Sequence, residues 1–205
     1  MKNINKYNLI KWYKMLTGRS ILHVNQGLGK IYSKTDIRGY YNDLTEKVTK
    51  DKNVDALNIP KFKIENGAEV IFPIAVFQYG LGAYDLYLLK GEVCFLEKFK
   101  LMADWTLNNQ EEKGSWNNFF YIYPDAPYSA MAQGEGISLL VRAYIHYSDS
   151  RYLDAAKKAV EFMLTPVESG GTTLYKNNDI FLQEVTNKST ILNGWIFALF
   201  GLYDF

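Results

Sequence analysis

Residues 128–164 read YSAMAQGEGISLLVRAYIHYSDSRYLDAAKKAVEFML, and this stretch decides the fold. Apolar residues recur at helical spacing over 129–147 and again over 150–164. That spacing predicts two helices, because it gathers the apolar side chains on one face of each. Ser129 stands where an N-cap is expected, and only Ser148-Asp149 separates the two helices. The pair is therefore expected to fold back on itself as a helical hairpin.

The same pattern extends in both directions from this hairpin. Helical spacing predicts helices over 72–90, 93–109 and 188–203. A short link joins the first two, whereas long loops rich in Gly, Asn or Pro flank the central hairpin. Alternating short and long links indicate stacked hairpins, so we predict an all-α chain that forms an incomplete α/α barrel (toroid). In such a fold the long loops lie on one rim, where a ligand cleft is expected. An irregular helical bundle is the alternative.

The N-terminal third of the sequence has a different character. Residues 1–16 could form a short amphipathic helix, and 17–70 are rich in Gly, Asn, Asp and Lys, with short extended pieces expected at 20–24 and 68–72. We therefore divide the chain into a basic, loop-rich N-terminal segment (1–70) and a helical domain (71–205). Residues 1–50 hold ten Lys and Arg against three Asp and Glu. This basic segment either binds an anionic polymer or a membrane surface, or packs on the acidic remainder of the chain.

Composition narrows the possible functions. The 205 residues are 48% hydrophobic and 22% charged, as in a globular protein, and 16% are aromatic, which suits either sugar contacts or a core. The single Cys94 excludes an intramolecular disulfide, and its apolar surroundings predict that it is buried. With only two His, no metal site is expected, and nothing in the sequence calls for a cofactor. No nucleic-acid motif, transmembrane segment or export signal is seen, which predicts a cytoplasmic protein. The oligomeric state is left open.

The predicted helix 129–147 carries unusual residues for its apolar context. Gly134 and Gly136 each cost about 1 kcal/mol relative to Ala within a helix, so either close helix packing or a ligand near the backbone must offset them. Gln133, Glu135 and Arg142 are polar. Glu135 and Arg142 lie on one face, seven residues apart, either as a structural ion pair or as a pair in a cleft that holds sugar hydroxyls or a carboxylate.

Two stretches resemble a known family. The string from Tyr128 to Tyr144 is similar to the Met-Ala-Gln-Gly segment of the D-glucuronyl C5-epimerase family, in its C-terminal catalytic domain. Residues 191–204, ILNGWIFALFGLYD, resemble that family's Leu-Asn-Gly and Gly-Leu-Tyr-Asp stretch. Weaker similarities at 78–81 and 39–43 extend the resemblance over about residues 39–205. It implies an α/α-barrel isomerase that converts D-glucuronate to L-iduronate in heparosan- or heparan-like polysaccharides, as in heparan sulfate biosynthesis.

The resemblance also implies a set of site residues. Removing the C5 hydrogen and returning a proton to the opposite ring face needs an acid/base group on each face. Glu184 matches the family's acidic residue, although Val185 stands where the family has Tyr. Further family tyrosines follow the Gly-Leu-Tyr-Asp motif and match no position here. Candidate residues for binding an anionic, uronate-containing polysaccharide are Gln133, Glu135, Arg142, Asn193, Tyr128 and Trp116.

Three functions are therefore considered. The first is a C5-epimerase with Glu184 as its acid/base residue. The second is a non-catalytic or degenerate fragment that binds uronate polysaccharides. The third is another α/α-barrel enzyme, such as a polysaccharide lyase or hydrolase.

Overall fold

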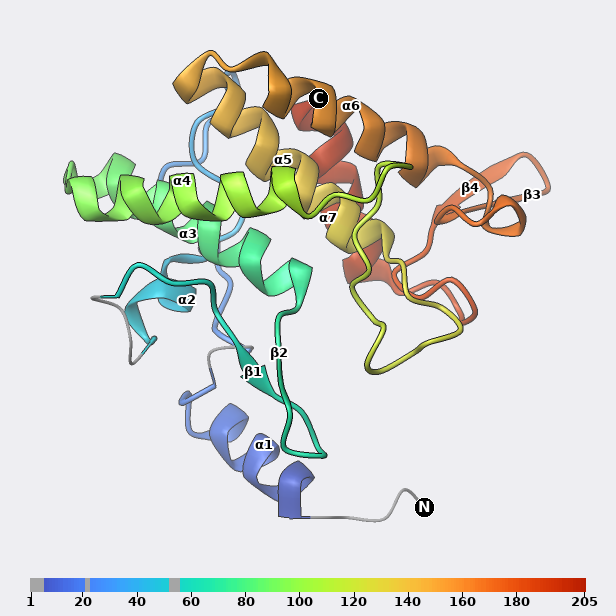
Figure 1. Cartoon of the computed structure of the whole chain (residues 1–205), viewed down its shortest axis with the longest axis horizontal. Helices are drawn as coiled ribbons and strands as arrows, with labels where there is room; N and C mark the ends of the chain where they lie inside the picture. Colours follow the sequence, from blue (N-terminus) through green and yellow to red (C-terminus); the bar gives the residue numbers. More distant parts are fainter. Residues whose placement is uncertain (1–5, 21–22, 52–55) are drawn as a thin grey trace.

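The computed structural model describes residues 6–20, 23–51 and 56–205 and is mostly helical (Figure 1). In chain order the elements are α1 (Lys6–Leu16), α2 (Thr45–Thr49), β1 (Phe62–Lys63), β2 (Glu69–Val70), α3 (Pro73–Lys90), α4 (Val93–Asn108), α5 (Ala130–Tyr147), α6 (Ser150–Leu164), the 3-10 turn Val167–Ser169, β3 (Thr173–Lys176), β4 (Asp179–Leu182) and α7 (Leu192–Asp204). The prediction of an all-α chain is confirmed.

The main helices begin and end where the sequence predicts. The hydroxyl of Ser129 accepts a hydrogen bond from the Ala132 amide and caps α5, and Asp149 caps α6 in the same way through the Arg151 amide. At the end of α3, Gly91 takes a left-handed conformation with φ 72°, which glycine adopts without strain. The last helix begins at Leu192, later than the predicted residue 188.

Two helical hairpins form the body of the molecule. Helix α3 packs against α4, and α5 packs against α6, each pair joined by a short link. Helix α5 is central, because it also packs against α3 and α7. Figure 1 shows that α3, α5 and α7 begin on the side that carries the long loops, while α4 and α6 run back in the opposite sense. The long loops therefore share one side, as the hairpin pattern predicts.

Of the short strands in the loops, only β2 falls within a predicted extended piece. Strands β1 and β2 form an antiparallel hairpin that includes part of the extended piece expected at 68–72, and β3 and β4 form a second one. Asn177 and Asn178 turn the second hairpin with φ of 52° and 65°, a geometry that Asn tolerates. For the extended piece expected at 20–24, residues 21–22 lie outside the described residues, and the others are not in a strand. Of the helix expected at 1–16, residues 1–5 lie outside the described part.

The N-terminal segment supplies part of the core. Tyr40, Leu44 and Val48 are fully buried and belong to the same hydrophobic cluster as the inner faces of α3 and α5. The backbone carbonyl of Leu44 lies so close to Gly82 of α3 that a Cβ there would collide with it. Helix α2 is thus held against α3 by close backbone contact.

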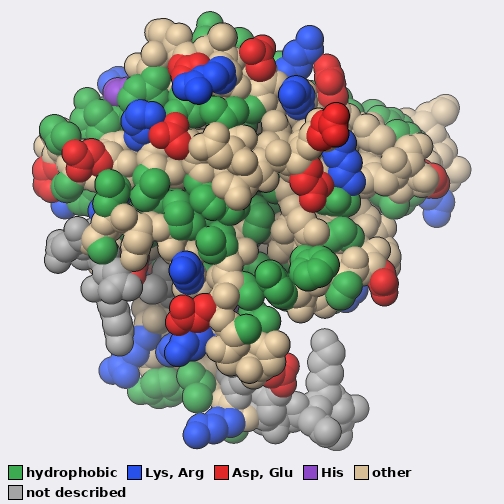
Figure 2. All heavy atoms as spheres, in the orientation of Figure 1, with side chains coloured by type: hydrophobic (Ala, Val, Ile, Leu, Met, Phe, Trp, Pro, Cys, Tyr) green, Lys and Arg blue, Asp and Glu red, His purple; other side chains and the backbone are tan. Residues whose placement is uncertain are grey.

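Basic residues of the N-terminal segment have more than one role. Lys30 pairs with Asp43 at 3.0 Å and Lys50 with Glu46 at 2.7 Å, so part of the charge is balanced within the segment. Figure 2 shows other Lys and Arg side chains, mixed with hydrophobic ones, at the end of the molecule formed by α1. The exposed apolar residues of α1 there include Leu9, Trp12 and Leu16.

The prediction that Cys94 is buried is wrong. Cys94 is exposed, in the first turn of α4, where Val93 is exposed as well. The next residue, Phe95, turns into the core instead. A run of four apolar residues at a helix start cannot all face inward, because the helical period spreads them around the axis.

Candidate functional site

A buried hydrogen bond joins the middle helices of the two hairpins. The side-chain amide of Gln78 on α3 donates from Nε2 to Oε1 of Glu135 on α5 at 2.9 Å. Both side chains are buried, and Oε2 of Glu135 is buried with no hydrogen-bond partner among the described residues. Burying a carboxyl oxygen without a hydrogen bond costs free energy of folding, so this arrangement indicates a functional group.

The charged side chains of Lys47 and Glu184 both shift the pKa of Glu135. Burial raises the pKa of Glu135, the hydrogen bond from Gln78 and the charge of Lys47 lower it, and the charge of Glu184 raises it. Lys47 of α2 is itself buried, which lowers its pKa, while the charge of Glu135 raises it. Residues from α2, α3, α5 and the loop after β4 thus form one electrostatic group, which we call the carboxylate cluster: Lys47, Gln78, Glu135 and Glu184.

Glu184 lies against the start of α7. A Cβ added to Gly194 would collide with Glu184 Oε2 and would lie 2.6 Å from Glu184 Cβ, so this approach requires glycine at position 194. Oε2 of Glu184 is buried without a hydrogen-bond partner among the described residues. Burial raises the pKa of the Glu184 carboxyl. An acid/base residue works best when its pKa lies near the operating pH, and a raised carboxyl pKa moves Glu184 in that direction.

Gln133 supports the loop that precedes α5. Its Oε1 accepts a hydrogen bond from the Trp116 amide at 3.2 Å, and its Nε2 donates to the carbonyls of Gly114 at 3.0 Å and Ala159 at 3.4 Å. The Trp116 indole is buried and donates to the Thr106 carbonyl at 2.9 Å. The polar atoms of Gln133 and Trp116 are therefore occupied by protein partners.

The two unusual glycines of α5 allow close packing. A Cβ on Gly134 would lie 2.6 Å from both Ala198 Cα and the Phe197 carbonyl oxygen of α7. A Cβ on Gly136 would lie 2.8 Å from the Trp116 ring. Close packing is thus what offsets the glycines, and at these positions the neighbours are α7 and Trp116.

Arg142 does not form the ion pair with Glu135 that the sequence spacing suggested. Its Nη1 pairs with Asp204 Oδ2 at 2.5 Å, and its Nε and Nη2 donate to the carbonyls of Arg38 at 2.9 Å and Gly39 at 3.1 Å. The other oxygen of Asp204 accepts a hydrogen bond from the Tyr41 hydroxyl at 2.9 Å. Residues seven apart share a helix face, but Glu135 turns toward α3 and Arg142 toward the N-terminal segment and α7.

The remaining candidates lie among the loops. The Tyr128 hydroxyl donates to Glu111 Oε2 at 2.9 Å, and the Lys113 ammonium lies 4.0 Å from the centre of its ring. Asn193 is exposed in the first turn of α7, next to the glycine that receives Glu184. The structure therefore brings Glu135 and Glu184 into one cluster, joins Gln133 to Trp116, and places Tyr128, Asn193 and Arg142 outside both groups.

Sequence reasoning missed several polar residues of the interior. Nothing in the sequence predicted that Lys47 is buried, because a lysine in a loop-rich basic segment is expected to be exposed. Gln78 and Asp85 could have been found, as polar residues within the apolar pattern of α3. Asp85 accepts a hydrogen bond from the Tyr40 amide at 3.0 Å, and burial raises its pKa to about 7.

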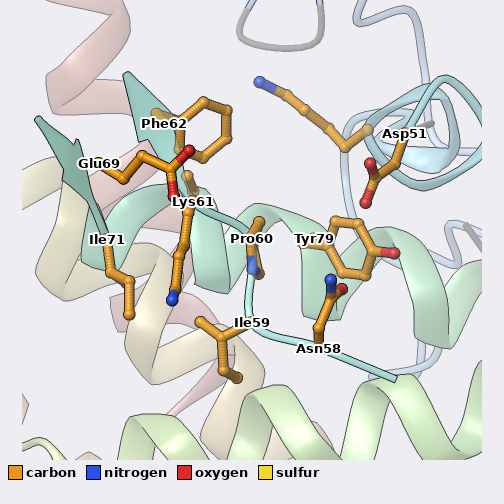
Figure 3. Close-up of a pocket in the computed structure, with 11 residues that line it drawn as sticks. Asp51, Asn58, Ile59, Pro60, Lys61, Phe62, Glu69, Ile71 and Tyr79 are labelled. Atoms are coloured by element: carbon orange, nitrogen blue, oxygen red, sulfur yellow. The ribbon is translucent and has the colours of Figure 1, made fainter. Parts of the chain in front are cut away.

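A cavity of about 590 Å³ (Figure 3) is lined in part by Lys47 of the carboxylate cluster. Its lining comes from α2, β1, β2, α3 and the residues next to them: Lys47, Asp51, Asn58, Ile59, Pro60, Lys61, Phe62, Glu69, Ile71, Ala75 and Tyr79. Figure 3 shows Asp51 and Tyr79 facing each other on one side, with Lys61, Glu69 and Ile71 on the other. Lys47 belongs to both the cavity and the cluster. A cavity of this size suits a small-molecule or sugar ligand.

Two further observations concern metals and membranes. Within residues 6–20, 23–51 and 56–205, no three or more His, Cys, Asp or Glu side chains are grouped so that they could hold a metal ion. None of the described helices combines the length and apolar character needed to cross a bilayer.

Comparison with known proteins gives a consistent result. Residues 102–205 match the family model described as the D-glucuronyl C5-epimerase C-terminus. A D-glucuronyl C5-epimerase from Caenorhabditis elegans is 36% identical over 116 residues, which cover 52% of this chain and 19% of that protein. The chain therefore matches about a fifth of the length of this relative. The matched residues include α5, the Glu184 loop and α7.

Proposed function

Since the chain belongs to the D-glucuronyl C5-epimerase family, we propose that it is an isomerase that epimerises C5 of D-glucuronate to L-iduronate. The substrate would be a heparosan- or heparan-like polysaccharide. The observation that carries this proposal is the carboxylate cluster, in which Glu184 and Glu135 are held close enough to interact and have raised pKa values.

The reaction sets clear demands on the site. The C5–H bond breaks, its electron pair moves into the neighbouring carboxylate of the sugar, and the proton passes to a base. A proton then returns to C5 from the opposite face of the ring. General acid–base catalysis contributes about 10²–10⁴-fold, and each group that stabilises the anionic intermediate about 10²–10³-fold. Several groups must therefore act together.

Each residue of the cluster has a role in this scheme. Glu184, on the loop before α7, takes or returns the C5 proton through its carboxyl group, which is only partly buried. Lys47 offsets the negative charge that develops as the enolate-like intermediate forms. Glu135, fixed by Gln78, keeps Lys47 in place and sets the local charge.

The other candidate residues divide into two groups. Tyr128 and Asn193 contact the polysaccharide from the loop side of the helices. Gln133, Arg142 and Trp116 hold the backbone around the site, since their polar atoms bond to protein partners.

The finer architecture is part of the same proposal. The hairpins form part of an α/α toroid whose inner layer is α3, α5 and α7, since these helices start on one side and α5 packs against both others. Residues 71–205 make up this helical domain. Residues 1–70 form a basic lead-in whose buried part, around Tyr40 and Val48, rests on it.

The test is hydrogen exchange at C5. The full chain is incubated in D2O with heparosan, the unsulfated polymer of glucuronate and N-acetylglucosamine, and deuterium at C5 is measured by NMR. We expect incorporation with the unaltered chain and none with Glu184→Gln, whose amide cannot accept the proton. The matched control is Glu161→Gln on the exposed face of α6, which should exchange as the unaltered chain does.

Each outcome decides between the functions. Exchange that survives Glu184→Gln would rule out Glu184 as the essential base. Polymer binding without any exchange by the unaltered chain would reject the isomerase and support a binding protein.

A further inference from the structure

We propose that the cavity of about 590 Å³ between α2, the β1–β2 hairpin and α3 is a second sugar-binding site, which takes the next uronate along the polymer from the one that reacts. Lys61 binds the carboxylate of that residue. This inference rests on the proposed function, because it assumes a uronate polymer, and it adds the site that holds the chain of sugars in register.

The cavity is next to the carboxylate cluster but separate from it. Neither Glu135 nor Glu184 lines it, while Lys47 belongs to both. A polymer whose reacting sugar lies at Glu184 has neighbouring sugars that need a place on the protein. The cavity offers a site for one of these sugars, and Lys47 connects this site to the carboxylate cluster.

The lining of the cavity suits a sugar ring. One part is apolar and can cover the C–H face of a pyranose: Ile59, Pro60, Ile71 and Ala75, with the ring of Phe62. The carboxylates of Asp51 and Glu69 and the amide of Asn58 add hydrogen-bonding groups for hydroxyls. A purely apolar ligand would desolvate these polar groups without offering them hydrogen bonds, which is unfavourable.

The charges indicate where a carboxylate would bind. Asp51 interacts with Tyr79, and its charge raises the pKa of the Tyr79 hydroxyl together with burial, the larger cause. Oε1 of Glu69 lies 3.9 Å from Nζ of Lys63 on the neighbouring strand. Lys61 forms no ion pair with a carboxylate of the described residues, so its ammonium group can take one from a ligand.

The same charges argue against a phosphate group. A phosphate monoester carries up to two negative charges and is usually held by arginine forks or several cations, whereas this lining has no arginine and balances its two lysines with two carboxylates. A single negative charge surrounded by hydroxyls, as in a uronate, fits the lining better.

The experiment measures binding and turnover with a defined ligand. A heparosan hexasaccharide is titrated into the full chain by calorimetry. Lys61→Glu should weaken binding by about tenfold or more, because it replaces attraction with repulsion at the carboxylate. The matched control, Lys176→Glu on the distant β3–β4 hairpin, makes the same charge change and should bind within about twofold of the unaltered chain. Both lysines are exposed, and unfolding midpoints of the two variants check that the fold is kept.

Two further measurements separate this inference from the proposed function. In the C5 exchange assay, Lys61→Glu should raise KM and leave kcat within about twofold, since Lys61 is away from the reacting carbon. With a carboxyl-reduced hexasaccharide, the unaltered chain and Lys61→Glu should bind alike.

The failures of the two proposals are distinguishable. Equal binding of the native hexasaccharide by Lys61→Glu and the unaltered chain would overturn the cavity site and leave the isomerase standing. Equal weakening of native and carboxyl-reduced ligands would overturn the carboxylate contact. Loss of hexasaccharide binding in Lys61→Glu, with no C5 exchange by the unaltered chain, would support the cavity site and reject the isomerase.

Discussion

Arg142 on α5 and Asp204 at the end of α7 form a buried ion pair, with Nη1 and Oδ2 2.5 Å apart and side chains only 2% and 1% exposed. The same guanidinium donates to the carbonyls of Arg38 and Gly39. One side chain therefore joins α5, α7 and the N-terminal segment. Two of the stretches that resemble the epimerase family, 128–144 and 191–204, meet at this pair.

Removing the Arg142 side chain should destabilise the fold strongly. Arg142→Met leaves Asp204 as a buried charge without its cation, which typically costs about 3–5 kcal/mol. The measurement is urea unfolding followed by tryptophan fluorescence. Arg151→Met, which breaks an exposed pair with Asp149, is the control and should barely move the midpoint. A midpoint for Arg142→Met equal to that of the control would contradict the role of this pair.

The contact between α5 and α7 should not tolerate a methyl group. Gly134→Ala places a Cβ 2.6 Å from Ala198 Cα, so the helices must separate, at a cost of about 1–3 kcal/mol. Gly27→Ala has open space around its added Cβ and should be neutral or stabilising by up to about 1 kcal/mol. Thermal unfolding of the two variants tests this. The packing argument fails if Gly134→Ala is as stable as Gly27→Ala.

Gln133 is expected to act through Trp116. In Gln133→Met the side chain keeps its approximate volume but loses its hydrogen bonds to the Trp116 amide and the Gly114 carbonyl. Each buried group left unpaired costs about 1–3 kcal/mol. We expect a lower unfolding midpoint together with a changed near-UV circular dichroism signal from the indole. An unchanged midpoint and spectrum would show that the loop is held by other contacts.

Asp85 should make stability fall as pH rises. Burial raises its pKa from 3.8 to about 7 in the folded chain, so the folded state holds the proton more tightly than the unfolded state does. The protonated Asp85 carboxyl contributes fully to the free energy of unfolding below pH 3.8, its pKa in the unfolded chain. This contribution is lost progressively as the pH rises to about 7, by up to about 4 kcal/mol. Asp85→Asn can still accept from the Tyr40 amide and has no charge to bury. The free energy of unfolding of Asp85→Asn should therefore rise relative to that of the unaltered chain as the pH increases from 4 to 7. Urea unfolding at several pH values measures this difference. A constant difference would exclude titration of Asp85 in this range.

Helices were predictable because their signals are local. The capping residues Ser129 and Asp149 and the stop at Gly91 are fixed by neighbours a few residues away, so the sequence places these boundaries well. The hairpins β1–β2 and β3–β4 are too short to show an alternating pattern. Helix α2 has only five residues, and it is stabilised by packing against α3 rather than by its own sequence.

The carboxylate cluster was only partly predictable. Glu184 and Glu135 were identified, one by resemblance and one as a polar residue in an apolar helix. Lys47 lies 88 residues before Glu135 in the sequence, and no periodicity of the sequence predicts that the two interact. The partner of Arg142 was mistaken for the same reason, since Asp204 lies 62 residues away and Glu135 on the same helix.

The hydrogen bond from Tyr41 to Asp204 spans 163 positions of the chain, and this has a consequence for the order of assembly. During synthesis Tyr41 and Arg142 emerge long before α7, so neither has its final partner when the α3–α4 and α5–α6 hairpins become able to form. Those hairpins rest on short-range contacts and can form early, whereas the hydrogen bond from Tyr41 to Asp204 can form only after α7 arrives. Folding is then expected to finish with the contact between residues 39–41 and α7 (Leu192–Asp204).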